Sequence, residues 1–419
     1  MNKVTNILSR ILKNKDNRVL FQNFAYLSVL QIASYVLPLL TIPYLASVVG
    51  VIGFGKIAFA SAVTVWIQTI TDWGFNYTAT RDLAQCRENK EKVSQIFSNV
   101  FWARCFLMIF SFFFLVLLIL SIPSFRTDRD ILLASFLTIP GHIMFPIWFF
   151  QAMEKMKYIT ILDVLSKVVF TLSVFIFITD SSDYVLQPIL LSLGYILSGL
   201  VSFFYILKKW KIHFYVCTLS QIFRSIKKST NIFLNELMPN LYNSFSVVLL
   251  GAWCGGTANG ILDAGSKLVN VVIQFIQVIS RAFFPYLSRN IDNHKYYVKI
   301  NLSVCVCFSV LLFFLAPFFI DLFFTKEFSD AIIILRIMAL SIVFMSMSNV
   351  YGINYLIIKG YEREIRNITG IVSIIGFVMA FPLVYYFSYI GAALTISITR
   401  ILLGLSMFLF AKRIQRTLV

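Results

Sequence analysis

The sequence is poor in charged residues, and poorest in the acidic and imidazole groups that many enzymes use. Of its 419 residues, 13% are charged, with only 19 aspartates and glutamates and 3 histidines. Soluble domains carry about 25% charged residues, so this composition excludes a soluble globular protein. The three histidines are isolated from one another, and the sequence contains no Walker A phosphate loop. We therefore expect no metal site, no cofactor and no ATP hydrolysis by the chain itself.

Cysteine is also sparse, and its spacing fits neither a disulfide framework nor a zinc site. The six cysteines are scattered along the chain: Cys86, Cys105, Cys217, Cys254, Cys305 and Cys307. We assign them to packing. The first 20 residues are basic and polar, and no small-residue cleavage site follows the first apolar run. This predicts a retained cytoplasmic tail rather than a signal peptide.

Hydrophobic residues make up 59% of the chain, and its mean hydropathy is +0.82. Apolar runs of about 17 to 25 residues, the length of a helix that crosses a bilayer, recur along almost the whole sequence. The sequence therefore predicts an all-α integral membrane protein of about twelve transmembrane helices, with no separate soluble domain. The expected spans are 22–46, 55–77, 97–122, 131–152, 158–179, 185–207, 230–253, 259–285, 299–320, 331–357, 366–387 and 390–411.

The basic residues indicate how these spans are oriented. Of the 36 lysines and arginines, 26 lie in segments on the side of the termini, whereas the opposite loops hold only 3. Because cytoplasmic loops are enriched in lysine and arginine, we expect both termini in the cytoplasm. The net charge of +17 follows from the same bias, so we expect no nucleic-acid partner.

Two halves of six spans echo each other. Gly50 and Gly55 recur as Gly255 and Gly260, 205 residues later. Two six-span units that start on the same side form a parallel repeat about an axis along the membrane normal, with a central cavity between them. The expected units are an N-terminal half, a basic cytoplasmic linker and a C-terminal half: 1–207, 208–229 and 230–419.

The eighth expected span carries the clearest polar pattern in the chain. Six polar residues recur at steps of 4, 3, 4, 3 and 4: Asp263, Lys267, Asn270, Gln274, Gln277 and Arg281. This spacing places them on one face of a helix over about 27 Å. Polar groups at membrane depth usually face a bundle interior or a wet cavity, so we expect this face to line the cavity. The alternative is structural, because Asp263 and Lys267 can also pair with each other at i,i+4.

Further polar residues lie in the spans that the repeat brings face to face. The second and seventh spans contribute Lys56, Gln68, Asp72, Asn235, Glu236 and Asn240. We interpret them as the lining of one central path. Pro38 and Pro43 interrupt the first span and Pro239 the seventh. A helix bends at such positions, and a moving hinge and a static kink are both open interpretations.

Three segments of the first half are distinctive: YLASVVGVIGFGKIAFA, DWGFNYTATRDLAQ and PIWFFQAMEKMKYIT. They resemble the bacterial O-antigen flippases (Wzx type) of the polysaccharide transporter family. This family lies within the multidrug/oligosaccharidyl-lipid/polysaccharide exporter superfamily. The likeness extends to the length, the twelve spans, the two halves and the basic N-terminus.

The resemblance implies a transporter and not an enzyme. Its substrate would be an undecaprenyl-pyrophosphate-linked O-antigen or related repeat unit, moved from the cytoplasmic to the periplasmic face of the bacterial inner membrane by alternating access. Other implied partners are a polysaccharide polymerase and a chain-length regulator.

Candidate roles for the polar residues follow from that substrate. A diphosphate would be screened by the bases Lys56, Lys267 and Arg281. Sugar hydroxyls would bind to the amides of Gln68, Asn235, Asn240, Asn270, Gln274 and Gln277. Asp263, Glu236 and Asp72 are candidates for exchanging protons or sodium, or else they neutralise nearby bases.

Two other functions are weighed against this interpretation. A drug or cation extruder of the same superfamily should have an acidic, aromatic pocket, whereas here bases associated with the spans outnumber acids by 7 to 4. A polysaccharide polymerase or ligase needs a sizeable outward loop with basic catalytic residues. The largest outward loops, 123–130 and 321–330, are too short to hold one.

Overall fold

The computed structural model describes residues 15–417, which are almost entirely helical. Nine helices in this part of the chain are long and apolar enough to cross a membrane. Two of them, α2 (Lys15–Asp72) and α16 (Glu362–Thr417), each extend over two successive expected spans, and a third, α12 (Ser244–Arg289), covers the span expected at 259–285 and the second half of the one expected at 230–253. The helix count is lower than twelve because successive spans are joined, and the predicted all-α membrane fold is confirmed.

The helices form two bundles joined by one linking helix, α11 (Leu219–Asn240). We call the two groups the first bundle and the second bundle. The first bundle contains α2, α3 (Phe75–Ala84), α4 (Lys90–Ser121), α5 (Pro123–Thr127), α6 (Arg129–Phe136), α7 (Thr138–Met144), α8 (Ile147–Ala152), α9 (Met156–Phe177), η1 (Ser181–Val185) and α10 (Leu186–Trp210). The second bundle contains α12, η2 (Ile291–Asn293), α13 (His294–Phe314), α14 (Ala316–Phe323), η3 (Lys326–Phe328), α15 (Ala331–Met347), η4 (Ser348–Ile357) and α16.

α2 and α12 break at glycines that occupy equivalent positions in the repeat. Gly50 has φ 66° and ψ −179°, and Gly255 has φ 81° and ψ −173°. Residues with a Cβ rarely adopt this region, whereas glycine enters it freely. The glycine spacing seen in the sequence is thus matched by one repeated backbone conformation.

Other expected spans differ from the structure in their continuity. The span expected at 131–152 consists of α6, α7 and α8, because Pro140 and Pro146 remove backbone donors from it. The span expected at 331–357 ends as a π-helix, η4. Pro38 and Pro43 lie inside α2 without breaking it, whereas Pro239 lies one residue before the end of α11. Of these three prolines, Pro239 is therefore the one at a helix break.

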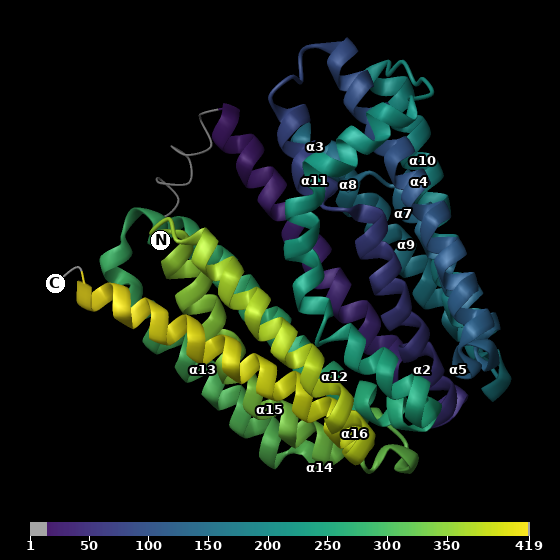
Figure 1. Cartoon of the computed structure of the whole chain (residues 1–419), viewed down its shortest axis with the longest axis vertical. Helices are drawn as coiled ribbons and strands as arrows, with labels where there is room; N and C mark the ends of the chain where they lie inside the picture. Colours follow the sequence, from purple (N-terminus) through teal and green to yellow (C-terminus); the bar gives the residue numbers. More distant parts are fainter. Residues whose placement is uncertain (1–14, 418–419) are drawn as a thin grey trace, which may run out of the picture.

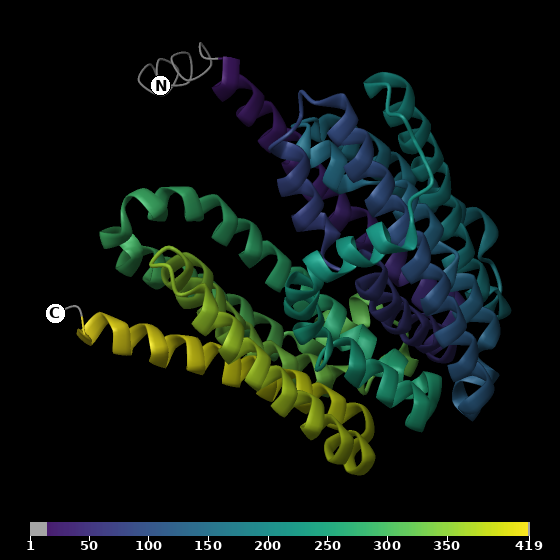
Figure 2. The same ribbon diagram turned by 45° about the horizontal axis from the view of Figure 1, so that its top comes forward.

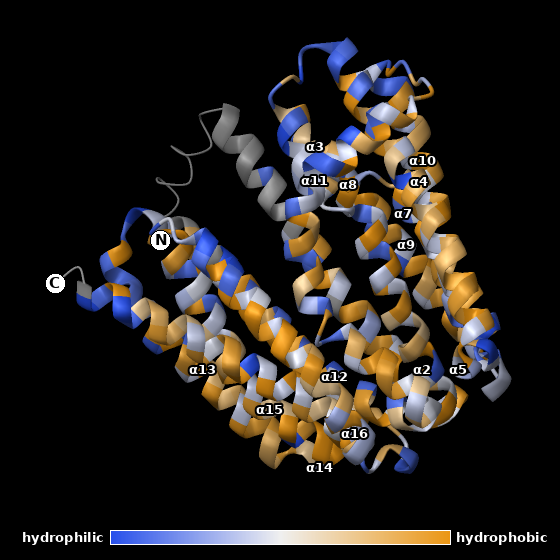
Figure 3. Cartoon of the chain, in the orientation of Figure 1, coloured by the Kyte–Doolittle hydropathy of each residue, from blue (hydrophilic) through white to orange (hydrophobic). Residues whose placement is uncertain are grey.

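The two bundles are arranged as a V. They meet where α2 crosses α12, and they diverge toward the end that carries the start of α2 and the end of α16 (Figures 1 and 2). Colouring by hydropathy places hydrophilic residues at the helix ends and connecting loops and apolar residues along the helix lengths (Figure 3). This distribution is that of a protein whose middle lies in a bilayer.

The outer face of α4 illustrates the surface that faces lipid. Phe113, Leu117 and Leu120 are 67%, 57% and 62% exposed in the isolated chain. A contiguous apolar face of this kind is unfavourable in water and favourable against acyl chains. The protein therefore crosses the membrane many times, as predicted.

The linking helix α11 packs on the first bundle. The Trp73 and Phe233 rings stack with their centroids 3.8 Å apart, and the hydroxyls of Thr78 and Ser229 lie 2.7 Å apart. The chain leaves α11 through a short turn after Asn240 and enters the second bundle as α12. The connection between the bundles is thus a turn at residues 241–243.

Candidate functional site

α2 and α12 cross backbone to backbone where the bundles meet. A Cβ built on Gly55 would lie 1.7 Å from the carbonyl oxygen of Gly256, and a Cβ on Gly260 would lie 2.2 Å from that of Val51. Small residues allow such close helix approaches inside membranes. We call this crossing the closed end. Any larger side chain at these two glycines would push the bundles apart.

Polar contacts between the bundles accompany the closed end. The backbone N–H of Val51, next to the break at Gly50, donates to Glu327 Oε2 at 3.2 Å. The Ser124 hydroxyl of the first bundle donates to the Ala252 carbonyl of α12. Each contact satisfies a polar group where the two bundles pack against each other. They must all break if this end opens.

An aromatic cluster lies beside the crossing. The Phe54 ring of α2 meets Phe324 and Phe328 of the second bundle edge-on, at centroid distances of 5.9 and 5.6 Å. On the same ring, Lys267 Nζ lies 4.2 Å from the centroid. Lys267 also forms an ion pair with Asp263, one helical turn away. The polar face of α12 therefore begins at the closed end and faces α2, and the i,i+4 pair considered from the sequence is present as well.

The polar partners of Lys56 all lie in the first bundle. Its Nζ lies 3.1 Å from Asp128 Oδ1 and 3.4 Å from the Tyr184 hydroxyl. The side chain is 22% exposed. The sequence indicated a base that meets substrate, but in this arrangement Lys56 is an ion-paired residue at the closed end.

The middle of the α12 face is occupied by an arginine from α16. Arg400 Nη2 donates to Asn270 Oδ1 at 3.3 Å, and its Nη1 donates to Ser341 Oγ at 3.4 Å. Arg400 is only 7% exposed. Asn270 therefore binds a buried guanidinium, a partner that the sequence pattern did not reveal.

The remaining residues of that face lie toward the diverging end. Gln274 and Gln277 are half-buried, and Arg281 is exposed. The face thus runs from an ion pair at the closed end to an accessible cation near the open part of the V. Along this face, Lys267 is ion-paired, Asn270 is hydrogen-bonded to Arg400, and Arg281 is exposed.

Asp72 lies in a second polar cluster, inside the first bundle. Arg104 of α4 forms an ion pair with Asp72, and its Nη2 lies 3.1 Å from Asn76 Oδ1. Arg104 is 3% exposed. Glu236 of α11 lies within electrostatic reach of both members of the pair. The sequence signal for Arg104 was a lone arginine in an otherwise apolar span, and such residues are seldom without a partner.

Three expected lining residues lie on α2 or α11. Asn240 Nδ2 donates to Thr69 Oγ1 of α2 at 2.9 Å. Gln68 is half-buried, and Asn235 is exposed. Asn235 lines a cavity of about 640 Å³ between α11 and α16. The structure therefore distributes the predicted site residues over the closed end, the interior of the first bundle and this cavity.

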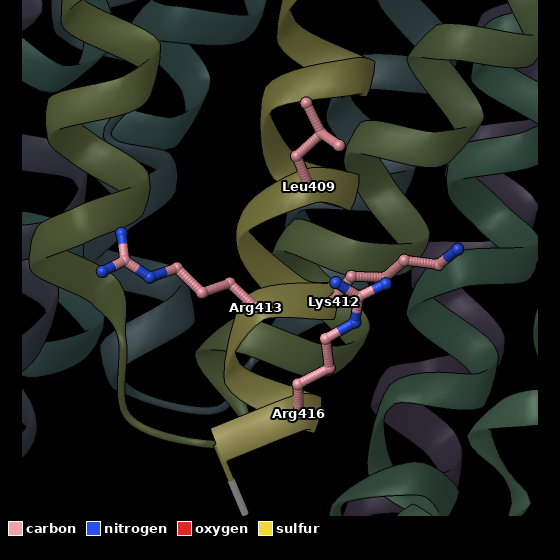
Figure 4. Close-up of a pocket in the computed structure, with 4 residues that line it drawn as sticks. All are labelled: Leu409, Lys412, Arg413 and Arg416. Atoms are coloured by element: carbon pink, nitrogen blue, oxygen red, sulfur yellow. The ribbon is translucent and has the colours of Figure 1, made fainter.

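A smaller hollow lies at the end of α16. It has a volume of about 360 Å³ and is lined by Leu409, Lys412, Arg413 and Arg416 (Figure 4). The Lys412 ammonium lies 4.6 Å from the Phe408 ring centroid. Basic side chains therefore gather at the end of the molecule where the last helix finishes. Among residues 15–417, no three side chains of the metal-binding types come together.

Proteins of similar sequence are named as transporters. The protein named "Putative O-antigen transporter" from Escherichia coli (strain K12) is 28% identical over 407 residues, which cover 95% of this chain and 98% of the relative. A protein of the same name from Shigella dysenteriae is 26% identical over 393 residues, covering 92% and 98%. Both likenesses extend over nearly the whole of each chain.

Solved structures share the fold. The lipid II flippase MurJ, in an inward closed conformation, superposes with a TM-score of 0.72 at 16% identity, covering 94% of this chain and 87% of that one. An inward-facing MATE family multidrug resistance transporter of the MOP superfamily gives a TM-score of 0.60 at 16% identity, covering 89% and 94%. The family model described as "Polysaccharide biosynthesis protein" matches residues 20–291. Since that match extends over more than half of the sequence, the chain belongs to the polysaccharide biosynthesis protein family.

Proposed function

We propose that the protein is a flippase for an undecaprenyl-diphosphate-linked repeat unit of O-antigen or a related polysaccharide. The observation that carries the proposal is the polar face of α12, which starts at the closed end and extends toward the diverging bundles. Such a face gives a polar headgroup a route through the membrane interior, while its prenyl tail stays in lipid. The names of the relatives from E. coli and S. dysenteriae support the same substrate class.

The orientation of the V gives the direction of loading. With both termini in the cytoplasm of a bacterium, as the positive-inside distribution favours, the diverging end of the bundles faces the cytoplasm. The structure then represents an inward-facing arrangement in the inner membrane. The substrate enters from the cytoplasmic side and leaves to the periplasm when the closed end separates.

The charges of the path suit an anionic headgroup that moves from one cation to the next. Arg281 and Lys267 lie 14 residues apart on one helix, which corresponds to about 21 Å along its axis. Guanidinium and ammonium groups both form strong charge-assisted bonds to phosphate oxygens. When the closed end opens, Lys56 exchanges Asp128 for the diphosphate. The amides of Gln274 and Gln277 bind sugar hydroxyls between the two cations.

Among the carboxylates proposed for ion exchange, Glu236 is the strongest candidate. Asp263 and Asp72 form ion pairs with Lys267 and Arg104. Within residues 15–417, no salt bridge involves Glu236. It is therefore the carboxylate of the three whose protonation changes net charge without breaking an ion pair.

The same pairing argues against a cation extruder. A cationic drug needs carboxylates that are not already neutralised, and three of the four carboxylates associated with the spans, Asp72, Asp163 and Asp263, each pair with a base, which leaves only Glu236 of these four. A growth-inhibition assay with cationic dyes tests this alternative, and we expect no protection from dyes by the protein.

Deletion and complementation test the proposed function. A deletion strain should accumulate lipid-linked single repeat units on the cytoplasmic face and lose surface polysaccharide. Lys267→Ala should restore less than about a tenth of the surface polysaccharide, since a lost charge-assisted contact of about 1.5 kcal/mol or more is worth at least tenfold. Lys267→Arg should restore most of it.

The matched control is Lys295→Ala, which removes an exposed lysine of α13 outside the path. It should complement fully at equal membrane abundance. Normal surface polysaccharide in the deletion strain would contradict the proposed function. Full complementation by Lys267→Ala would instead remove the α12 face from the route.

A further inference from the structure

A cavity lies between α11 and α16, two helices that pack with different bundles. α11 packs on the first bundle, whereas α16 is part of the second. Both helices start at the diverging end of the V. The cavity, of about 640 Å³, is within the size range of ligand sites. Its lining residues are Asn231, Leu234, Asn235, Met238, Arg366, Asn367, Gly370, Ile371 and Ile374. We call it the α11–α16 groove.

The groove changes in polarity along its length. Arg366 and Asn367, in the second turn of α16, are exposed and lie at its outer end. Ile371 and Ile374 follow one to two turns deeper and are 62% and 52% exposed. From Arg366 to Ile374 the helix rises about 12 Å. A cation at the membrane surface is thus followed directly by exposed apolar side chains.

On the groove side of α11, a polar row and an apolar row of side chains run next to each other. Asn231 and Asn235 lie one helical turn apart, and Leu234 and Met238 form a parallel apolar row beside them. A Cβ on Gly370 would lie 3.9 Å from the Met238 sulfur, so the two helices come within van der Waals reach of each other at the inner end of the groove. No ion pair of Arg366 with a carboxylate exists within residues 15–417. The guanidinium is therefore available to an external anion.

We propose that the α11–α16 groove binds the polyprenyl diphosphate of the substrate before the sugar enters the central path. The diphosphate accepts hydrogen bonds from Arg366 and from the amides of Asn231 and Asn367. The first isoprene units lie along Leu234, Ile371 and Ile374, and the rest of the chain continues into the bilayer. This inference rests on the proposed function and adds to it the place where the lipid carrier docks.

Charge and shape favour this occupant over an ordinary phospholipid. A diphosphate offers two neighbouring phosphate groups to one guanidinium and several amides, whereas a phosphodiester offers one. The apolar residues Leu234, Ile371 and Ile374 continue from the polar end of the groove, as the single methyl-branched chain of a polyprenyl diphosphate continues from its headgroup, whereas a phospholipid carries two acyl chains. Because the groove lies between parts that move relative to each other, closing the V would displace the bound diphosphate.

Binding measurements on the full-length protein in detergent test the proposal. Native mass spectrometry would titrate undecaprenyl diphosphate in one series and phosphatidylglycerol in the other. Arg366→Ala should weaken undecaprenyl diphosphate binding about tenfold, and Arg366→Lys should weaken it less. The matched control, Arg363→Ala, removes an exposed arginine one turn earlier that does not line the groove, and it should leave affinity unchanged.

Cross-linking locates the bound chain independently of affinity. A photoreactive benzophenone side chain at Ile371 should cross-link to undecaprenyl diphosphate. The same group at Leu409, an exposed leucine in the part of α16 that follows its break at Ser388, should not. Equal effects of Arg366→Ala and Arg363→Ala, or full displacement by phosphatidylglycerol, would overturn the groove assignment and leave the flippase proposal intact. No saturable binding of undecaprenyl diphosphate to the wild type would instead count against the proposed function.

Discussion

At the scale of single residues, several charged side chains of the membrane spans are organised in pairs. Asp72 with Arg104, Asp163 with Lys167 and Asp263 with Lys267 each join opposite charges inside a span. Removing an ion from water costs several kcal/mol, and a close partner recovers much of that cost. Loss of one partner leaves the other charge uncompensated. The pairs therefore bear on stability as well as on transport.

The Arg104–Asp72 pair gives the clearest stability prediction. Arg104→Gln should lower the free energy of unfolding by about 3 kcal/mol, because Asp72 keeps its charge without a partner. Denaturant titration in detergent, followed by tryptophan fluorescence, measures the change. The double variant Asp72→Asn/Arg104→Gln should lose less than the sum of the two single variants.

An exposed pair in the same bundle is the control for that measurement. Arg81 and Asp82 also form an ion pair, but the Arg81 side chain is 58% exposed. Arg81→Gln should change the free energy of unfolding by less than about 1 kcal/mol. Equal losses in Arg104→Gln and Arg81→Gln would show that burial of the pair is unimportant.

At the scale of helices, the crossing of α2 and α12 sets which end of the V is closed. The crossing depends on Gly55 and Gly260, where even one methyl group would meet a backbone carbonyl. Interlocking small residues have little tolerance for added volume. The population of closed and open arrangements should thus respond to single methyl groups at these positions.

Gly55→Ala and Gly260→Ala should shift the protein toward opening at the closed end. Labelling tests this in a cysteine-free background with Ile57→Cys, a site only 7% exposed in the present arrangement. A membrane-impermeant maleimide added from the periplasmic side should label the glycine variants several-fold faster than the parent. The control is Gly352→Ala, where the nearest side-chain atom is at an ordinary 3.6 Å. Unchanged labelling in both glycine variants would show that the crossing does not control this end.

The helical elements also show what the sequence could and could not predict. Gly50 and Gly255 were visible as a repeat because one backbone conformation demands glycine at both. The pairing of Asn270 with Arg400 was not, since 130 residues separate them and only packing brings them together. For the same reason the sequence indicated a polar face on α12 but not the buried guanidinium that occupies its middle.

The surface on which α11 packs could not be predicted from the sequence either. The sequence indicated a basic linker at 208–229 and a membrane span at 230–253, whereas one helix, Leu219–Asn240, extends across that boundary. Phe233 stacks on Trp73, so this helix lies on the first bundle. The π-helix η4 was equally hidden, because its apolar composition is that of any membrane helix. Thus the sequence predicted where helices are, and the structure adds how they pack.

At the scale of the whole molecule, alternating access requires two parts that move as rigid bodies about a hinge. The contacts of α11 place it with the first bundle, although the expected C-terminal half begins at residue 230, in the middle of this helix. We therefore expect the hinge at the turn 241–243, beside Pro239. Opening and closing of the V should therefore change the distance between α11 and α16 but not the distance between α11 and α3.

Two cross-links in a cysteine-free background test this division. The pair Thr78→Cys/Ser229→Cys joins α3 to α11 where the native hydroxyl oxygens are 2.7 Å apart, close enough for a disulfide. It lies inside one rigid body, so oxidation should leave surface polysaccharide unchanged. The pair Gly370→Cys/Met238→Cys spans the two bodies, and a short bis-methanethiosulfonate reagent across it should stop transport until dithiothreitol removes it. If α11 moves with the second bundle instead, the first cross-link will block transport and the second will not.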